Sequence, residues 1–382
     1  TVTFAIKNAY QNVADIQEQL VKAVLISSKS VIALKSIIPI LKAAKQKQIP
    51  FQHLGAGLYQ LGWGCHSRLL NSSGGQNDSA IGSRLTQNKF TTASILNRAG
   101  LPGPEHYAVS DIASAQKSAA MLPGAVVVKP LDADRGEGVT INVTNDSQLK
   151  EAFSNAQKYT ELQEVLVEKQ VAGLCYRLVI QKNKLLYCVK RTPTSITGNG
   201  RDSIKDLVND YNLKQSLLPL WKREKEIPFD DETLDTLAAK NFSLDSIPDT
   251  GEEIPVRYLE STEWGGGSVD VTADVHPDNL AIAVQAADLF KLEVSGVDII
   301  TEDISIPWHQ SEAIINEVNF LPSLGQSDAS LEYIPQYLAN IIEDKGRIPV
   351  ELINADASGV ELAKDRQRYY QMQGIDCFIT TH

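Results

Sequence analysis

The chain has 382 residues, of which 43% are hydrophobic and 22% charged, a composition typical of globular proteins with two or three structural units. Its formal net charge of -11 argues against nucleic-acid and anionic-membrane partners, which are bound by clustered Lys and Arg. No stretch approaches the roughly 20 apolar residues of a membrane span. The opening TVTFAIKNAY lacks the basic start and apolar centre of a signal peptide, so we expect a cytoplasmic protein.

The cysteines and histidines predict neither a zinc site nor a disulfide framework. The four cysteines are far apart and form no C-x-x-C pair, and the six histidines are equally scattered. We expect reduced, mostly packed thiols and assign no metal to any histidine.

The first 85 residues are predicted to form a helix-rich region. Apolar residues at three- and four-residue spacing from Ala14 to Gln48 indicate helix, and Pro50 closes the pattern. The polar loop NSSGGQNDS, residues 71–79, separates this opening from a second helix in TQNKFTTASILNRAG, which ends at Gly100. The first boundary therefore lies near residue 85.

The next hundred residues alternate strands with one helix. AVVVKP, residues 125–130, is typical of a buried strand, DADRGEGV of a glycine-containing turn and TINV of a returning strand. DSQLKEAFSNAQKY predicts a helix capped by Asp146 or Ser147, and EVLVEK predicts another strand. RLVIQKNKLLYCVKR predicts a hairpin that turns between Lys182 and Lys184.

The remainder predicts one capped helix, a charged insertion and two strands. GRDSIKDLVNDY indicates the helix, KREKEIPFDDETLDTLAAK a solvated helical insertion, and VSGVDIITED and AIINEVN the strands. Residues 346–382 predict a strand, a helix and a strand that pack on the body as a short adjunct. No repeat of 20 to 50 residues recurs, and the class is α+β with mainly antiparallel sheets.

The stretch IINEVN, residues 314–319, places a carboxylate and an amide two residues apart. Alternate side chains of a strand share a face, so Glu317 lies beside Asn319, while Asn316 and Val318 point the other way. A lone pair of this kind is usually the solvated face of an edge strand. It also suits Mg²⁺, which prefers hard oxygen ligands together with nucleotide phosphate.

Read in order, the motifs resemble the ATP-grasp ligases. The series contains Lys89 in a helix, VVVKP, a glycine-bearing turn, VEK, YRLVI, VKR, VDIITEDI and INEVN. QLGWGCHSRLL, KPLDADRGEGVTINV, GNGRDSIKDLV, GGGSVDVT and INEVNFLPSLG look like the ATP-grasp region of cyanophycin synthetase and its relatives. The resemblance covers about residues 50–348. It implies an ATP-grasp fold, with nucleotide between a lid lobe, 86–173, and a C-terminal lobe, 174–345, that carries the Mg²⁺ and acceptor sites.

The resemblance also implies the roles of individual residues. Asp298, Glu317 and Asn319 would hold Mg²⁺, and Asp303 is a weaker candidate that could simply end a strand. Lys129 ends a buried strand, where an unpaired ammonium is costly, so it needs a nucleotide phosphate or a structural ion pair. The full set of remaining nucleotide contacts is Lys89 at the phosphates, Asp132, Gly136 and Gly138 in the lid turn, and Glu168, Lys169 and Val171 at the adenine.

Two arginines complete the expected catalytic set with Lys129. Arg177 and Arg191 match the family's phosphate-side arginines, whose forked donors suit phosphate or acyl-phosphate oxygens. A surface ion pair is the alternative for each of them.

The sequence departs from the family pattern in four places. Cys175 stands where an acidic residue often contacts ribose, and the lid turn reads LDADRGEG rather than LDGNHGRG. RYLESTEWGGGS lacks the family's Arg and Asn pattern followed by S-T-G-G, so the family's substrate is not carried over. GRIPV continues without the G-x-x-x-x-G-K-[ST] of a second nucleotide site.

The sequence therefore predicts an ATP- and Mg²⁺-dependent, ADP-forming carboxylate–amine ligase acting on amino acids or short peptides. Relatives of this type imply a homo-oligomer. Two alternatives stay open: an ATP-grasp enzyme that passes the acyl phosphate to a nucleophile other than an amine, and a nucleotide-binding regulatory subunit without turnover.

Overall fold

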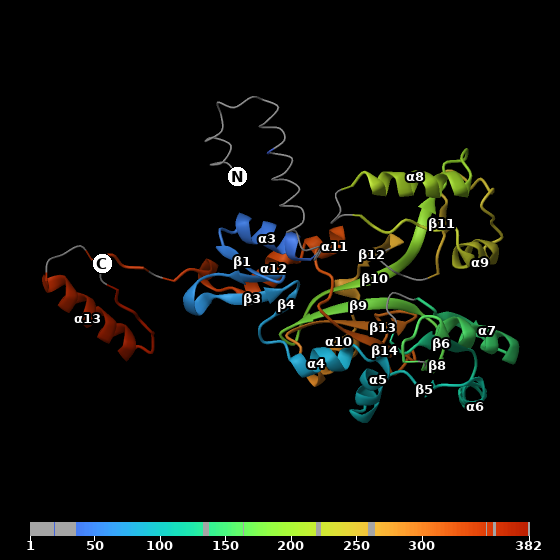
Figure 1. The fold of residues 1–382 in the computed structure, drawn as a ribbon, viewed down its shortest axis with the longest axis horizontal. Coiled ribbons are helices and arrows are strands. Elements are labelled where there is room, and N and C mark those ends of the chain that lie inside the picture. The colour runs from blue at the N-terminus through green and yellow to red at the C-terminus, as the bar shows by residue number, and fades with distance from the viewer. Residues whose placement is uncertain are drawn as a thin grey trace.

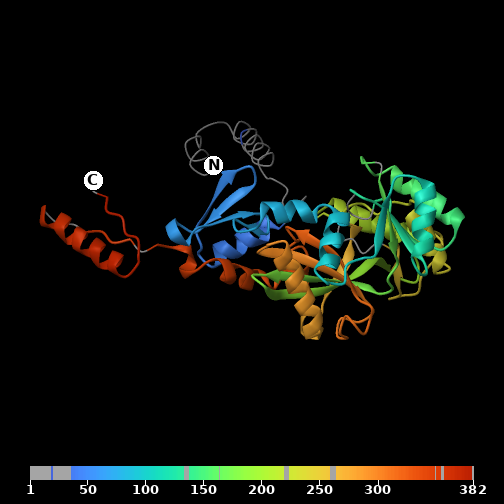
Figure 2. The same cartoon turned by 90° about the horizontal axis from the view of Figure 1, so that it is seen from below.

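The computed structural model describes residues 19, 36–132, 137–162, 164–218, 223–258, 264–348, 350–353 and 357–380. Its described strands form three antiparallel sheets, and Figures 1 and 2 show them following one another along the long axis. Residues 14–35 of the predicted first helix, Gln19 excepted, lie outside this part of the chain.

The N-terminal region contains a small sheet that the sequence did not predict. After α3 (Ile37–Gln46), the chain forms a four-stranded meander from β1 (Phe51–Gly55), β2 (Leu58–Leu61), β3 (Arg68–Asn71) and β4 (Gly74–Gly75). The strands are short and separated by glycines, so no alternating pattern is long enough to indicate them. Helix α4 (Ala80–Thr86) then leads to α5 (Lys89–Arg98).

The second sheet has the order β5-β8-β6-β7. Its strands are β5 (His106–Val109), β6 (Val126–Pro130), β7 (Thr140–Val143) and β8 (Val165–Lys169), and α6 (Ile112–Met121) and α7 (Asp146–Gln157) pack on it. The predicted helix is confirmed, but its predicted cap is wrong. Asn145 is the N-cap and accepts from the Gln148 amide, because the helix begins at Asp146, one residue earlier than a cap at Asp146 and two earlier than a cap at Ser147 would require.

The third and largest sheet has the order β11-β10-β9-β13-β14, and β12 also pairs with β10. Its strands are β9 (Leu174–Gln181), β10 (Lys184–Thr197), β11 (Glu253–Pro255), β12 (Gly266–Asp270), β13 (Val294–Thr301) and β14 (Ile314–Phe320). The predicted hairpin is confirmed, and its turn uses positive φ at Lys182 and Asn183. In β10, Pro193 lies where the pairing with β12 shifts register.

The two faces of this sheet have different neighbours. Leu178 and Val297 join a core with α10 (Pro277–Leu289), whereas Val179 and Val294 join a core with α3 and α12 (Ile334–Ile341). Asn316 is an extra residue in β14, because Asp298 pairs with Glu317 while Ile299 pairs with Ile315. This bulge keeps both Ile315 and Val318 in the α10 core.

The charged insertion folds as a module rather than as a solvated helix. Helix α8 (Ile204–Ser216), α9 (Asp231–Ala239) and the end of β10 enclose their own core, which includes the fully buried Ile204, Val208 and Leu237. Strand β11 pairs with the end of β10, so the module grows directly from the large sheet. Figure 1 shows it standing beside the small β5–β8 sheet.

The predicted adjunct at the C-terminus differs from the structure. Residues 350–353 and 375–380 form no strands, and α13 (Ala357–Met372) lies apart from the body in both Figures 1 and 2. The remaining short elements are α11 (Asp328–Leu331), η1 (Gly64–His66), η4 (Thr272–Asp274) and η5 (Asp344–Gly346). Across the described residues, every helix falls short of the length and apolarity that crossing a bilayer demands.

A steric test of this architecture is available at Gly82 in α4. A Cβ at this position would overlap the carbonyl oxygen of Phe290, which follows α10. We expect Gly82→Ala to lower the free energy of unfolding by about 2–3 kcal/mol, because neither backbone can give way. Urea denaturation measures the change, with Ser83→Ala as the neighbouring control. Equal effects of both variants would contradict this packing.

Candidate functional site

Three strands place four predicted site residues side by side. Asp298 of β13 lies opposite Arg177 of β9 on one side and opposite Glu317 of β14 on the other. Arg177 donates from Nε to Asp298 Oδ1 at 2.6 Å and from a terminal nitrogen to Oδ2 at 2.5 Å. Asn319 Nδ2 lies 3.3 Å from the same Oδ2. These residues occupy the face opposite the α10 core.

The Arg177–Asp298 pair is buried and ionised. Asp298 is 3% exposed, and burial alone would raise the pKa of its carboxyl, but Arg177 and Arg191 outweigh burial and lower it. Burial likewise disfavours the Arg177 cation, but Asp298 reverses that effect and raises the guanidinium pKa. The two charges therefore hold each other in place.

The predicted Mg²⁺ ligands are brought together, but one of them already has a cationic partner. Two carboxylates and an amide oxygen form a suitable hard-oxygen set. Because Arg177 contacts both oxygens of Asp298, an ion bound here shares that carboxylate with the guanidinium. Asp303 is exposed, and its Oδ1 accepts from the amide and hydroxyl of Ser305, which fits the strand-ending alternative.

A second charged cluster lies on the β5–β8 sheet. Lys129 Nζ is 2.8 Å from Glu168 Oε2, and His106 Nδ1 is 3.6 Å from the same oxygen. Burial would raise the pKa of Glu168, but Lys129 and His106 together lower it. Two residues predicted to bind nucleotide are therefore ion-paired with each other, and Lys129 already has the anionic partner that its buried position requires.

The other predicted nucleotide residues lie around this cluster. Lys89 begins α5, and the next residue, Phe90, stacks on His106 with 5.1 Å between ring centroids. Lys169 ends β8 and donates its backbone N–H to the Glu105 carbonyl, and Val171 follows two residues later. The structure does not describe Gly136.

The described ends of the lid turn make local contacts. Asp132 Oδ2 accepts from the Glu161 amide at 3.1 Å. Gly138 has a φ of 70°, and a Cβ there would press on Tyr159 and Pro130. The described ends of the turn therefore lie close to residues 159–161, in the segment that precedes β8.

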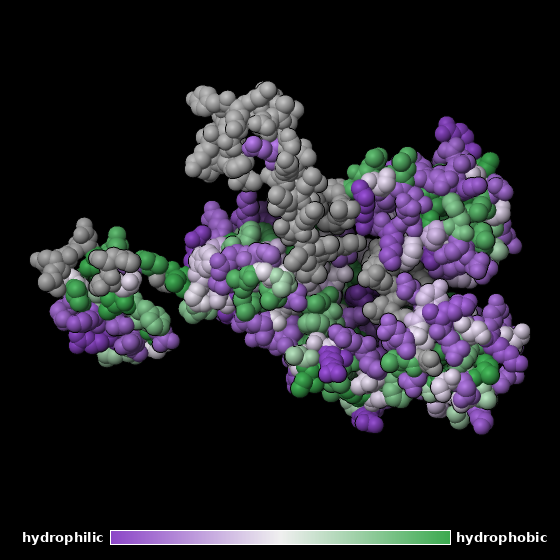
Figure 3. Space-filling model, viewed as in Figure 1, coloured by the Kyte–Doolittle hydropathy of each residue, from purple (hydrophilic) through white to green (hydrophobic). Residues whose placement is uncertain are grey.

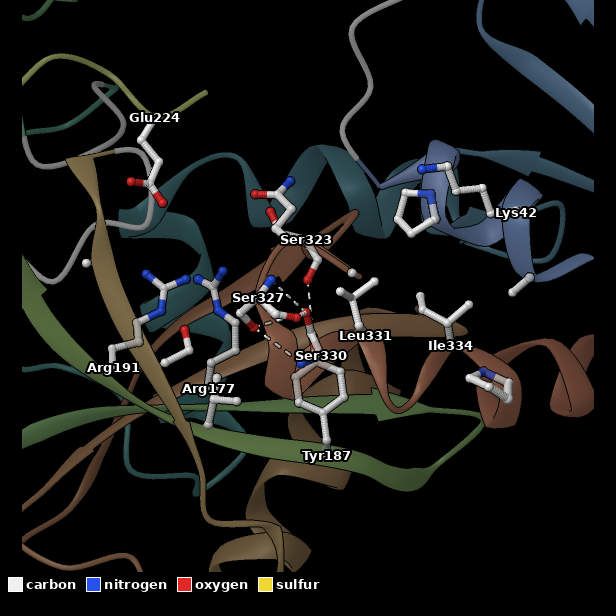
Figure 4. A pocket seen from close by; sticks show the side chains of 18 of the residues that line it. Lys42, Arg177, Tyr187, Arg191, Glu224, Ser323, Ser327, Ser330, Leu331 and Ile334 are labelled. Atoms are coloured by element: carbon white, nitrogen blue, oxygen red, sulfur yellow. Dashed lines mark hydrogen bonds between the residues drawn. The ribbon is translucent and has the colours of Figure 1, made fainter. Parts of the chain in front are cut away.

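A cavity of about 610 Å³ opens above Arg177 and Arg191. Figure 4 shows the two guanidinium groups next to one another, with Glu224 on one side and Lys42 of α3 on the other. Arg223 also lines the cavity, as do the hydroxyls of Ser323, Ser327 and Ser330. Among the described residues, four cations and one carboxylate therefore line this pocket in a chain of net charge -11, which favours an anionic ligand. Figure 3 shows the surface hollowed between the α8–α9 module and the small-sheet lobe.

Sequence reasoning missed Lys42, Arg223, Glu224 and the three serines. Their segments are distant along the chain, and each looks like ordinary surface sequence on its own. The charged run KREKE carried a weak signal, because it supplies Arg223 and Glu224. The Glu224 carboxylate accepts hydrogen bonds from the Tyr211 hydroxyl and from Gln215 Nε2, the latter at 3.0 Å. Its position in the cavity wall is therefore fixed, unlike that of a solvated surface residue.

The atypical segment RYLESTEWGGGS helps to attach the module. Arg257 is 5% exposed, and its guanidinium pairs with Asp230 and Glu232 of the module. It also lies 4.5 Å from the centre of the Trp264 ring, and Lys225 lies 5.0 Å from the same ring. These contacts hold the module against the start of β12, which lines the cavity at Gly266 and Ser268.

Comparison with known sequences confirms the resemblance to cyanophycin synthetase. The enzyme of that name from Geminocystis herdmanii is 28% identical over 310 residues, covering 80% of this chain and 35% of its own length. That from Crocosphaera subtropica is 26% identical over 392 residues, covering 98% and 43%. The glutathione biosynthesis bifunctional protein GshAB of Desulfotalea psychrophila is 28% identical over 253 residues, covering 65% and 32%. The chain thus spans roughly a third to two fifths of the relatives' lengths, and no family model matches it.

Comparison with solved structures identifies the fold. The bifunctional glutathione synthetase of Pasteurella multocida superposes with a TM-score of 0.55 at 23% identity, covering 78% of this chain and 44% of that one. The chain has the ATP-grasp fold, as the ordered motifs predicted.

The buried Arg177–Asp298 ion pair makes the free energy of unfolding depend on pH. The pKa of Asp298 in the folded protein lies below its ordinary value of 3.8, so its stabilisation is present above that value and is lost as pH falls through the folded-state pKa. We expect Asp298→Asn to cost about 3–5 kcal/mol near pH 7, because it leaves Arg177 buried and uncompensated. That cost should shrink below about pH 4.

Urea unfolding at a series of pH values measures this cost, with Asp245→Asn at an exposed position as control. A cost that stays constant from pH 7 to pH 3 would show that the Asp298 charge does not stabilise the fold.

Proposed function

We propose that the chain is an ATP- and Mg²⁺-dependent carboxylate–amine ligase that forms an amide bond through an acyl phosphate and releases ADP. The observation that carries the proposal is the row formed by Arg177, Asp298 and Glu317, next to Arg191 at the floor of an electropositive cavity. The similarity to cyanophycin synthetase and to GshAB, over 80% and 65% of this chain, supports it. Amino acids or short peptides fit a cavity of about 610 Å³.

In this proposal, the substrate carboxylate attacks the γ-phosphoryl group of ATP, and an amine then displaces phosphate from the acyl phosphate. The chain supplies position and charge rather than a covalent intermediate of its own. Arg177 and Arg191 offer forked donors to the phosphate and acyl-phosphate oxygens from the floor of the cavity. Lys89 and Lys129 neutralise the nucleotide phosphates, and the lid turn from Asp132 to Gly138 excludes water.

Asp298, Glu317 and Asn319 are the residues that would hold Mg²⁺, which supplies charge neutralisation at the phosphates. Asp298 also fixes Arg177, so the same carboxylate links the proposed metal site to the phosphate-binding arginine.

We propose that the two lobes have the separate binding functions that the sequence motifs suggested. Residues 86–173 include the β5–β8 sheet with Lys129 and Glu168 and would bind the base. Residues 174–345 include the large sheet with Arg177 and Glu317 and would carry the metal and acceptor sites. The rebuilt segment around Arg257 supports an acceptor different from those of the relatives.

We also propose a homo-oligomeric, cytoplasmic enzyme. Exposed Phe51, Leu54, Leu58 and Leu69 on the N-terminal sheet support association between copies. The four cysteines, all in the described part of the chain, are not joined in disulfides, which supports a reducing compartment. Light scattering after size-exclusion chromatography tests association, and a monomer at micromolar concentration would contradict it.

Glu317→Gln tests the metal site more cleanly than any change at Asp298, because Asp298 also pairs with Arg177. Glutamine keeps the shape of Glu317 but removes its charge, so we expect ADP release to fall at least about a hundredfold with the thermal midpoint nearly unchanged. Glu302→Gln, exposed near the end of β13, is the matched control. Near-normal turnover by Glu317→Gln would rule out this metal assignment.

Isotope transfer tests the intermediate. An acyl phosphate hands one carboxylate oxygen of the substrate to the departing phosphate, so ¹⁸O in the acid should appear in inorganic phosphate. The acid is found by screening ADP release with pooled amino acids and dipeptides, and mass spectrometry then follows the label. Label in AMP would instead indicate adenylation. ATP binding without substrate-dependent ADP release would favour a regulatory subunit.

A further inference from the structure

His106 is a buried histidine to which the ligase chemistry gives no task. Its side chain is 5% exposed, and it lies on β5 directly opposite Glu168 of β8. Its Nδ1 is 3.6 Å from Glu168 Oε2, the oxygen that Lys129 Nζ approaches to 2.8 Å on the other side. One carboxylate oxygen therefore lies between two nitrogens.

The imidazole ring is held from a second element. Phe90 stacks on it at an interplanar angle of 28°, and Phe90 follows Lys89 at the start of α5. The ring is thus fixed by β5 through the backbone and by α5 through stacking. A fixed ring beside a carboxylate restricts the positions that the carboxylate can adopt.

The charges around Glu168 keep it an acceptor. An ionised carboxylate accepts hydrogen bonds but donates none. It therefore binds the N–H of an amine and repels a carbonyl oxygen, which is itself an acceptor. Lys129 and His106 outweigh the effect of burial and lower the pKa of Glu168, which maintains this state at neutral pH. Since both nitrogens approach Oε2, an exocyclic amine of a bound base would meet Oε1.

We propose that His106 is a positioning residue for base selection: with Lys129, it holds the Glu168 carboxylate so that the site accepts the 6-amino group of adenine and rejects a 6-oxo purine. The separation of 3.6 Å is longer than a hydrogen bond, so the contact is electrostatic here, and a movement of roughly half an ångström on nucleotide binding makes it a hydrogen bond. The inference rests on the nucleotide site of the proposed function but not on amide formation.

The test compares ADP with inosine diphosphate, which carries an oxo group in place of the 6-amino group and a hydrogen on the neighbouring N1. Calorimetric binding in Mg²⁺ buffer needs no acid, amine or turnover. A hydrogen bond to a charged group is worth about tenfold or more in affinity, so the wild-type chain should prefer ADP by at least about tenfold.

Two substitutions at His106 distinguish the effect of its Nδ1 nitrogen from the effect of its stacked ring. His106→Phe keeps a ring to stack on Phe90 but removes Nδ1, and we expect it to reduce the preference for ADP to within about twofold. His106→Asn removes the ring but returns an amide nitrogen near the position of Nδ1, and it should keep most of the preference. His309→Phe, at a half-exposed position outside the cluster, is the control and should leave the preference unchanged.

A merely structural role for His106 predicts another result: His106→Phe would weaken ADP and inosine diphosphate equally and preserve their ratio, which would overturn the inference. Equal affinity of the wild type for both nucleotides would also overturn it. Should His106→Phe fail to fold, Phe90→Leu loosens the ring and should lower the ratio by about threefold, and an unchanged ratio counts against the inference.

The same measurements, together with the assay of ADP release, separate a failure of the inference from a failure of the proposed ligase function. A wild-type chain that binds neither nucleotide would overturn both the inference and the proposed function. Selective ADP binding without ADP release in any substrate pool would contradict the ligase alone and would leave base selection by His106 supported.

Discussion

The buried ion pair between Arg177 and Asp298 constrains everything around it. Two opposite charges on adjacent strands are tolerated in a sheet interior only because they satisfy one another with two short hydrogen bonds. That requirement fixes the register of β9 against β13, and β13 in turn brings Glu317 alongside. The bulge at Asn316 then lets β14 keep its apolar residues in the α10 core while Glu317 and Asn319 remain beside Asp298.

In the proposed function, the two charged clusters would divide ligand recognition between two sheets. The small sheet holds Lys129, Glu168 and His106, where a base and its phosphates would lie, and the large sheet holds the arginines and the acidic row. Each cluster pairs a cation with a carboxylate, Lys129 with Glu168 and Arg177 with Asp298. Binding of an anionic ligand therefore competes with an internal partner, which lowers affinity but raises selectivity for ligands that supply equivalent contacts.

How much could be predicted from sequence differs between the two parts of the site. Strand alternation was sufficient to place Glu317 beside Asn319, and the order of the motifs was sufficient to identify the fold, because both are local or collinear properties. The partnership of Lys129 with Glu168 and the contribution of Lys42 depend on segments more than 30 residues apart or on different elements, and no local pattern encodes such pairings. The β1–β4 sheet was missed because its strands are short, and α13 was expected against the body although amphipathic sequence alone does not say where a helix docks.

The continuity of β10 has a mechanical consequence. One uninterrupted strand carries Arg191 in its middle and the α8–α9 module at its end, and Pro193 interrupts the ladder between them. A strand that lacks one hydrogen bond bends most easily at that point. Arg223 and Glu224 belong to the module, so one strand connects this wall of the cavity to Arg191 at its floor. The wall and the floor of the cavity are therefore carried by different stretches of β10, on either side of Pro193.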